Sequence, residues 1–266
     1  GQGGFQMQKD LDSKRSKSVI FRYNLQDTKI SHLILPGLIP TQDLSVRLSS
    51  LSASFLRDTR DNVLDAHKGI YESFEFTINP SVLGSSVDFL RFLGQTAYYK
   101  NLWGGFVFAN SVRLGLEGPF NGSHVPLSEE FFTGGGSSLR GFPLNGAGPQ
   151  RGIFACSSGE TAPNCPLISV PLGGPALFIV NSELRTPQFI PVPFIKKIGL
   201  AAFYDGGNVY QHIRFNNFAT DFTSSVGGGL RYATPVGPIR IDIGHNLNSL
   251  PGIKSTQIFV TLGQAF

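Results

Sequence analysis

Charged residues are scarce in this chain. Only 15% of its 266 residues are Asp, Glu, Lys or Arg, against about 25% in an ordinary soluble domain, while 41% are hydrophobic. The sequence also lacks the unbroken run of about 18 apolar residues that a membrane-spanning helix needs. The composition therefore favours a surface that faces something other than water, and it excludes a membrane protein built from helices.

Further absences narrow the class of protein. The net charge is +4, but the basic residues are scattered and cluster only at 14–17 and 196–197, so we expect no nucleic-acid partner. No Gly-x-Ser-x-Gly or His-Glu-x-x-His motif occurs, which argues against an enzyme; a barrel lipase with its Ser and His on the outer wall is the alternative. The five His residues are scattered, and we expect no metal and no cofactor. No signal peptide is visible, which indicates a mature or excised form.

The chain has only two cysteines, Cys156 and Cys165, in one stretch rich in Ser, Gly and Pro. Two sulfurs without a nearby His pattern make a poor zinc site. In an exported protein their simplest role is a local disulfide.

What the sequence does contain is alternation with a period of two. In 238–245, isoleucines occupy every second place and Arg240 and Asp242 stand between them. The segment 105–117 alternates in the same way. Charges at this spacing are costly inside a soluble sandwich, the alternative all-β fold, but they suit a sheet with lipid on one face and a wet lumen on the other.

Eleven segments of this kind predict an all-β fold, a transmembrane antiparallel up-and-down β-barrel. An odd number of strands is unexpected in a closed barrel with both termini on one side, so we expect a missed strand or an incomplete chain. The expected strands are 3–10, 17–30, 45–57, 69–79, 88–100, 105–117, 175–186, 198–209, 225–234, 238–246 and 256–266.

Connections between these segments alternate between shorter and longer ones. Short turns on the periplasmic side and long loops outside the cell are typical of outer-membrane barrels. With the C-terminus on the periplasmic side, the longest connection, 118–174, is expected outside the cell.

That connection contains the most specific motif of the chain. Its residues Gly134–Gly136 are followed by Ser137-Ser138-Leu139-Arg140-Gly141-Phe142, which resembles a loop signature of the outer-membrane assembly proteins, the family that includes BamA, TamA and the two-partner secretion transporters. In that family the loop folds back into the lumen, and its Arg pairs with acids on the barrel wall. The resemblance implies these roles for Leu139, Arg140, Gly141 and Phe142.

Two acids are candidate partners for Arg140. Glu183 and Asp205 stand in segments, 182–187 and 203–207, that resemble the next two strands of the family. Strand parity also places both on the inward face. An enclosed guanidinium needs forked, charge-assisted hydrogen bonds, so we expect the three side chains to form a lumenal cluster.

The last residues resemble the signal of outer-membrane strands. We expect Ile258, Val260, Leu262 and Phe266 to lie on one face, with Gly263 three places before this final aromatic, and we expect the strand to form a lateral seam. The residues of this signal are Ile258, Val260, Leu262, Gly263 and Phe266. The turn at 58–69 also resembles a family turn, with Ala66 where Pro is usual.

The resemblance implies a sixteen-stranded barrel of which residues 1–266 form the C-terminal portion, with the upstream POTRA domains absent. It implies insertion of other proteins at a bacterial outer membrane, or at an organelle outer membrane of bacterial origin. The partners it implies are membrane lipids, unfolded outer-membrane proteins, periplasmic chaperones and accessory lipoproteins. The alternatives are a two-partner secretion transporter and a passive diffusion porin.

Overall fold

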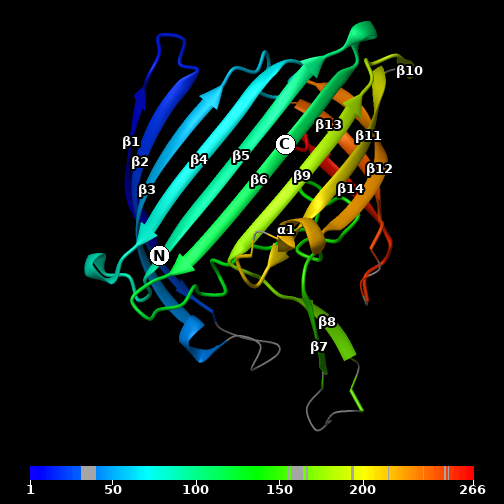
Figure 1. The fold of residues 1–266 in the computed structure, drawn as a ribbon. Coiled ribbons are helices and arrows are strands. Elements are labelled where there is room, and N and C mark those ends of the chain that lie inside the picture. Colours follow the sequence, from blue (N-terminus) through cyan, green and yellow to red (C-terminus); the bar gives the residue numbers. More distant parts are fainter. Residues whose placement is uncertain are drawn as a thin grey trace.

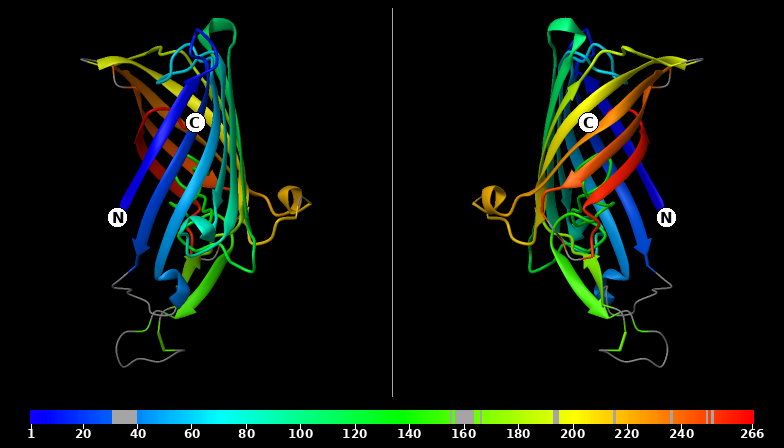
Figure 2. Two further views of the ribbon diagram at one scale, coloured as in Figure 1. Left: turned by 90° about the vertical axis from the view of Figure 1, so that its left-hand side faces the viewer. Right: turned by 90° about the vertical axis from the view of Figure 1, so that its right-hand side faces the viewer.

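A single curved antiparallel sheet makes up most of the molecule (Figure 1). The computed structural model describes residues 1–30, 40–154, 156, 164–165, 167–192, 195–214, 216–235, 237–248, 250 and 252–266. Seen from the side, the strands tilt and the sheet bends around a concave face (Figure 2). Strands joined by turns are hydrogen-bonded neighbours, which is the up-and-down arrangement that the alternation predicts.

Eleven strands follow one another in the order β1-β2-β3-β4-β5-β6-β9-β11-β12-β13-β14, and β10 pairs with β11 alone. They are β1 (Gln2–Asp10), β2 (Lys17–Lys29), β3 (Ser45–Asp58), β4 (Gly69–Asn79), β5 (Phe89–Asn101), β6 (Val107–Pro119), β9 (Ala176–Arg185), β10 (Ile190–Val192), β11 (Ile195–Tyr210), β12 (Thr223–Thr234), β13 (Gly237–Asn246) and β14 (Thr256–Leu262).

Other elements are short. β7 (Gln150–Phe154) and β8 (Leu167–Pro171) form a separate two-stranded sheet. The helical turns are η1 (Thr41–Asp43), η2 (Ser81–Leu83), η3 (Trp103–Gly105) and α1 (Asn217–Thr220). Within the described part of the chain, no helix is long and apolar enough to cross a membrane.

All eleven predicted strands are confirmed, with differences at three places. The last strand ends at Leu262 and not at Phe266, because Gly263 turns the backbone away with a φ of +89°, a conformation that only glycine adopts readily. The pair β7 and β8 lies in a stretch predicted to be loop. β10 precedes β11, whose predicted start was three residues too late.

The two faces of the sheet differ as the alternation predicts. On β13, Ile241 is 40% exposed on the convex face, whereas its neighbour Asp242 is completely buried on the concave face. Since Cβ atoms alternate across a strand, one apolar row and one polar row follow from the sequence. The convex face therefore carries the apolar band, and the buried charges gather inside.

One end of the sheet holds the longest connection, that between β6 and β9, and we call it the long-loop end; the connections at this end are 30–44, 80–88, 120–175, 211–222 and 247–255. The β7–β8 hairpin projects from this end (Figure 1). Part of the connection between β6 and β9 packs on the concave face, where Leu139 and Phe142 are buried against Ile179 of β9 and Val209 of β11. The main apolar core is therefore made by a loop and the wall behind it.

Among the described residues, β1 pairs only with β2, and β14 only with β13. Within the described residues, each of these two strands is therefore paired along one edge.

Candidate functional site

The site begins with a close approach of the β6–β9 connection to the wall. A Cβ added at Gly244 of β13 would lie 2.1 Å from the carbonyl oxygen of Arg140, and one added at Gly141 would lie 2.4 Å from the Cβ of Ser225 on β12. Real side-chain atoms do not come this close. Glycine at both places therefore lets the loop backbone lie directly on β12 and β13.

Arg140 reaches two acids from this position. Its Nε donates to Oδ2 of Asp205 at 2.8 Å and its Nη2 to Oδ1 at 2.7 Å, while Nη1 donates to Glu183. All three side chains are 0–1% exposed. Burial alone would lower the pKa of Arg140, but the hydrogen bonds and charges of Asp205 and Glu183 outweigh it and raise the pKa above its ordinary value. The guanidinium therefore stays charged and fixed.

Two neighbours hold this arrangement. The Cζ of Arg140 lies 3.5 Å from the ring centroid of Phe203, which is the geometry of a cation–π contact. The amide of Asn181 donates to Ser138 O at 2.6 Å and to Asp205 Oδ1 at 2.8 Å, so it ties the loop backbone to the acid. The sequence prediction did not include Phe203 or Asn181, although their inward parity could have indicated both.

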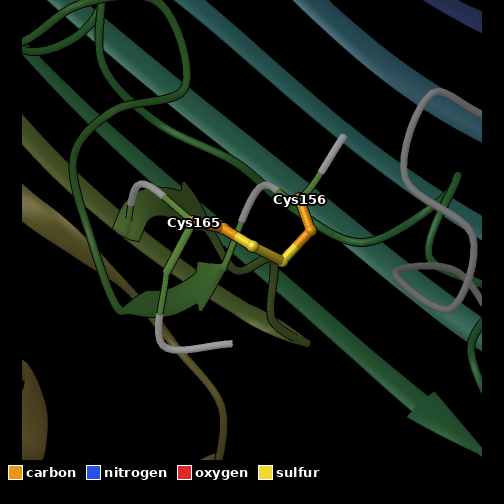
Figure 3. Close-up of a disulfide and its surroundings, with 2 residues drawn as sticks. All are labelled: Cys156 and Cys165. Atoms are coloured by element: carbon orange, nitrogen blue, oxygen red, sulfur yellow. A yellow bond between two sulfur atoms is a disulfide. The ribbon is translucent and has the colours of Figure 1, made fainter. Parts of the chain in front are cut away.

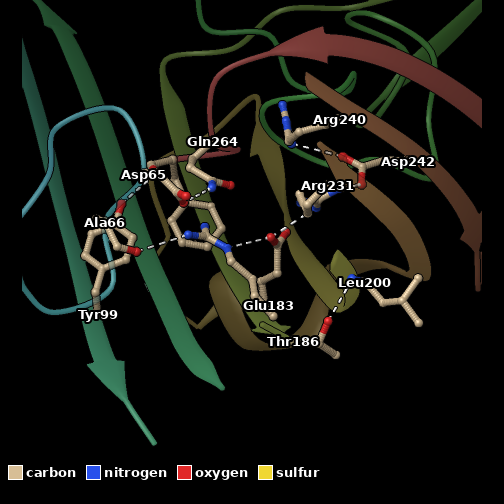
Figure 4. A network of polar contacts seen from close by, with 12 residues as sticks. Asp65, Ala66, Tyr99, Glu183, Thr186, Leu200, Arg231, Arg240, Asp242 and Gln264 are labelled. Carbon is tan, nitrogen blue, oxygen red and sulfur yellow. Dashed lines mark hydrogen bonds and ion pairs between the residues drawn. The ribbon is translucent and has the colours of Figure 1, made fainter. Parts of the chain in front are cut away.

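Three more arginines extend the cluster along the wall, and Figure 4 labels two of them, Arg231 and Arg240. Oε1 of Glu183 accepts from Arg185 Nε at 2.9 Å and from Arg231 Nη2 at 3.0 Å. Asp242 accepts from Arg231 Nη1 at 2.6 Å and from Arg240 Nη1 at 3.0 Å. Parity alone assigned Arg240 and Asp242 to the lumen, but it did not place them in this network.

Seven charged side chains are thus interlocked, one from the loop and six from β9, β11, β12 and β13: Arg140, Arg185, Arg231, Arg240, Glu183, Asp205 and Asp242. Removal of one partner from a buried ion pair costs several kcal/mol because the other charge is left uncompensated. The arrangement therefore fixes the loop to the wall, and these ion pairs have a structural role.

The predicted terminal residues separate into two groups. Ile258, Val260 and Leu262 are 61–69% exposed on the convex face, as expected for a lipid-facing row. Phe266 does not continue this row, and that part of the prediction is wrong. After Gly263 the chain turns inward, where Tyr99 Oη donates to the carbonyl oxygen of Phe266 at 2.5 Å and the two rings stack.

The same tail contacts the connection between β3 and β4. Gln264 Nε2 donates to Asp65 Oδ1 at 2.5 Å, and the carbonyl oxygen of Ala66 accepts from Arg185 at 3.3 Å (Figure 4). Ala66 is buried. This turn therefore joins the last residues to the arginine network.

Cys156 and Cys165 form a disulfide beside the β7–β8 hairpin (Figure 3). The bond closes a segment of sequence separation 9 in the connection at the long-loop end. The structure does not bring this pair into the Arg140 cluster, so its effect is confined to the hairpin.

The chain is similar in sequence to one superfamily of outer-membrane proteins and to two of its relatives. Residues 3–266 match the family described as "Omp85 superfamily domain". Over 198 residues the chain is 29% identical to "Outer membrane protein assembly factor BamA" of Nitratidesulfovibrio vulgaris, which covers 73% of this chain and 22% of that protein. It is 35% identical, also over 198 residues, to a "SAM50-like protein" of Schizosaccharomyces pombe, covering 70% of this chain and 38% of the relative.

Among solved structures, the crystal structure of BamA from Haemophilus ducreyi lacking POTRA domains 1–3 matches 97% of this chain and 53% of its own, with a TM-score of 0.71 and 17% identity. At this identity the likeness shows the fold. The chain spans well under half the length of the two curated relatives.

Proposed function

The chain belongs to the Omp85 superfamily and lies in an outer membrane, and from this premise we propose that it takes part in assembling other proteins into that membrane. The observation that carries the proposal is the match to a relative named as an outer-membrane assembly factor, together with a BamA-like sheet over nearly the whole chain. Its substrates are unfolded outer-membrane proteins, and its surroundings are membrane lipids. Periplasmic chaperones and accessory lipoproteins are the further partners in this proposal.

The working part is the edge of β14. This strand has seven residues, against ten in its neighbour β13, so it offers the first strand of a closed barrel only a short edge for pairing. Free backbone donors and acceptors in lipid are costly, so an edge there templates an incoming strand. The seam opens near Gly263, because the chain turns inward there and the last residues do not lengthen β14.

The loop that carries Arg140 supports the wall while the seam works. Its charges tie β9, β11, β12 and β13 together from the inside. A Cβ at Gly136 would lie 3.3 Å from Phe259 and Thr261, so the loop also touches the concave face of β14. The strands next to the seam are thereby held in register.

The test is reconstitution of the full-length parent into liposomes, with protease protection of an unfolded barrel substrate as the measure of insertion. We expect the wild type to accelerate insertion and both Arg140→Ala and Gly263→Ala to reduce the rate. No acceleration by the wild type would overturn the proposal. Export of a soluble protein into the liposomes would instead indicate a secretion transporter, and large steady single-channel currents would indicate a porin.

A further inference from the structure

One connection at the long-loop end folds over the convex face of the sheet. It joins β11 to β12, contains α1 and is described at 211–214 and 216–222. In both views of Figure 2 the part around α1 stands out sideways from the wall, beside the strands, whereas the β7–β8 hairpin projects beyond their ends. The connection therefore occupies the side of the sheet that faces lipid.

Stacked rings attach this connection to the wall. Phe178 of β9 lies on the convex face, since the next residue, Ile179, is buried on the concave face. The ring of Phe218 stacks on that of Phe178, with a centroid distance of 5.8 Å and an interplanar angle of 10°. The ring of Tyr210 lies 4.7 Å from that of Phe218, and the ring of Phe222 lies 6.3 Å from that of Phe178. We call Phe178, Tyr210, Phe218 and Phe222 the aromatic patch.

A glycine of the wall makes room for the patch. A Cβ added at Gly206 of β11 would lie 2.2 Å from Cε1 of Phe222, so this ring rests directly on the strand backbone. Beside it, Asn208 Nδ2 donates to the carbonyl oxygen of Asp221 at 2.8 Å. The connection is thus held against the convex face by ring contacts and a hydrogen bond.

The height of the patch in the membrane follows from β11. Leu200, 36% exposed on the convex face near the start of this strand, and Asn208 are eight positions apart. At about 3.3 Å per residue and a tilt of about 40°, they are separated by about 20 Å along the membrane normal. The apolar band of an outer-membrane barrel is about 25 Å tall and has aromatic girdles at its borders. The patch therefore lies at the border on the long-loop side.

The backbone of this connection is irregular apart from α1, and irregular backbone is excluded from the hydrocarbon core, where its polar groups would lack partners. We infer that the connection lies in the headgroup region of the leaflet on the long-loop side and binds lipid through Ile213, Phe218 and Phe222. Ile213 is 43% exposed and adds an apolar side chain to the rings. The connection is a lipid anchor that fixes the depth of β9, β11 and β12. Such an anchor requires only that the chain lies in an outer membrane, whatever it assembles there.

The experiment measures the depth of a tryptophan in place of Phe218. The full-length parent and its Phe218→Trp variant are reconstituted into phosphatidylcholine vesicles, and the emission that the variant adds is quenched by brominated lipid or by acrylamide. Bromine is placed near the glycerol end or near the middle of the acyl chains. We expect bromine near the glycerol end to quench roughly twofold more strongly than bromine near the middle, and acrylamide to quench weakly.

Two further positions calibrate the depth. Ile241→Trp, at a site 40% exposed in the middle of β13 on the convex face, should be quenched more strongly by bromine near the middle of the chains. Leu144→Trp, at a site 78% exposed in the connection that packs on the concave face, should respond to acrylamide and not to brominated lipid.

Changes to the patch test what holds the connection in place. In the Phe218→Trp background, Phe178→Ala removes the stacked ring and Gly206→Leu displaces Phe222. We expect each change to reduce quenching by brominated lipid by about half or more, whereas Phe76→Ala, elsewhere on the convex face, should leave it unchanged. A heat-modifiable band shift on electrophoresis identifies the folded variants before quenching is measured.

Strong acrylamide quenching of Phe218→Trp without quenching by brominated lipid would place the connection in water and overturn the inference. Protection from every quencher would indicate a protein that covers the connection, and stronger quenching by bromine near the middle of the chains would indicate the hydrocarbon core; either result would also overturn it. Unchanged quenching in both patch variants would overturn the role of the aromatic patch.

Discussion

The guanidinium of Arg140 lies over the ring of Phe203, with its Cζ 3.5 Å from the ring centroid. Its N–H groups donate to Asp205 and Glu183. One face is thus covered by an aromatic ring, and the edges are bound to acids. Lysine has no planar group that could do both, which explains physically why the loop motif carries an arginine.

Replacement of Phe203 tests the stacking contact. We expect Phe203→Leu to lower the free energy of unfolding by about 1–2 kcal/mol, since it removes the cation–π contact but keeps an apolar side chain. Urea denaturation in lipid measures it. Phe76→Leu, on the exposed convex face, is the control and should change stability by less than about 0.5 kcal/mol; equal effects would contradict the assignment.

We expect substitution of Arg140 to destabilise the protein far more than substitution of Phe203. Arg140→Ala leaves the buried carboxylates of Glu183 and Asp205 without their shared cation, and we expect a loss of about 3–5 kcal/mol. Arg140→Lys keeps the positive charge but lacks the forked guanidinium, so we expect its stability to lie between those of the wild type and Arg140→Ala. Arg214→Ala removes an exposed arginine and should leave the unfolding curve unchanged. An Arg140→Ala protein as stable as the wild type would refute the structural role.

The close approach at Gly244 makes a steric prediction. In Gly244→Ala the new Cβ would overlap the carbonyl oxygen of Arg140, so the loop must lift from the wall. We expect faster proteolysis within 120–150 and a stability loss of about 1–3 kcal/mol. Gly118→Ala is a matched control, because a Cβ there meets nothing within 4 Å. Comparable cleavage of both variants would show that the loop does not depend on Gly244.

The inward tail can be released in two ways. Tyr99→Phe removes the hydrogen bond to Phe266, worth about 1 kcal/mol, and Gly263→Ala imposes strain of about 1–3 kcal/mol at a φ of +89°. Both should speed hydrogen exchange at 263–266, with little change in β5. Exchange in the tail that stays at the wild-type rate would show that Tyr99 and Gly263 do not hold it.

Reduction of the Cys156–Cys165 disulfide should act locally. The bond lies beside a hairpin that is hydrogen-bonded separately from the main sheet, so we expect faster amide exchange in β7 and β8 and an unchanged unfolding transition of the main sheet. A Cys156→Ser, Cys165→Ser double variant should no longer respond to reductant. A lower transition of the main sheet on reduction would show that the hairpin supports the wall.

The period-two pattern was enough to predict the eleven strands and, within them, an apolar and a polar face. Ile241 and Asp242 show why. Adjacent side chains of a strand point to opposite faces, so the face of one residue determines the face of the next. Glu183 and Asp205 could be paired with Arg140 in advance because the loop and both segments resemble those of the family, and strand parity also placed both acids inside.

Other features depended on contacts between distant segments. Arg185 and Arg231 are 46 positions apart, yet register places both on one oxygen of Glu183. Phe266 has the parity of a lipid-facing residue, but the turn at Gly263 and the contact with Tyr99 override it. Local alternation thus determined the strands and their two faces. Only the packing of loop, tail and wall decided which inward groups meet, because that choice depends on register and backbone approach across the whole sheet.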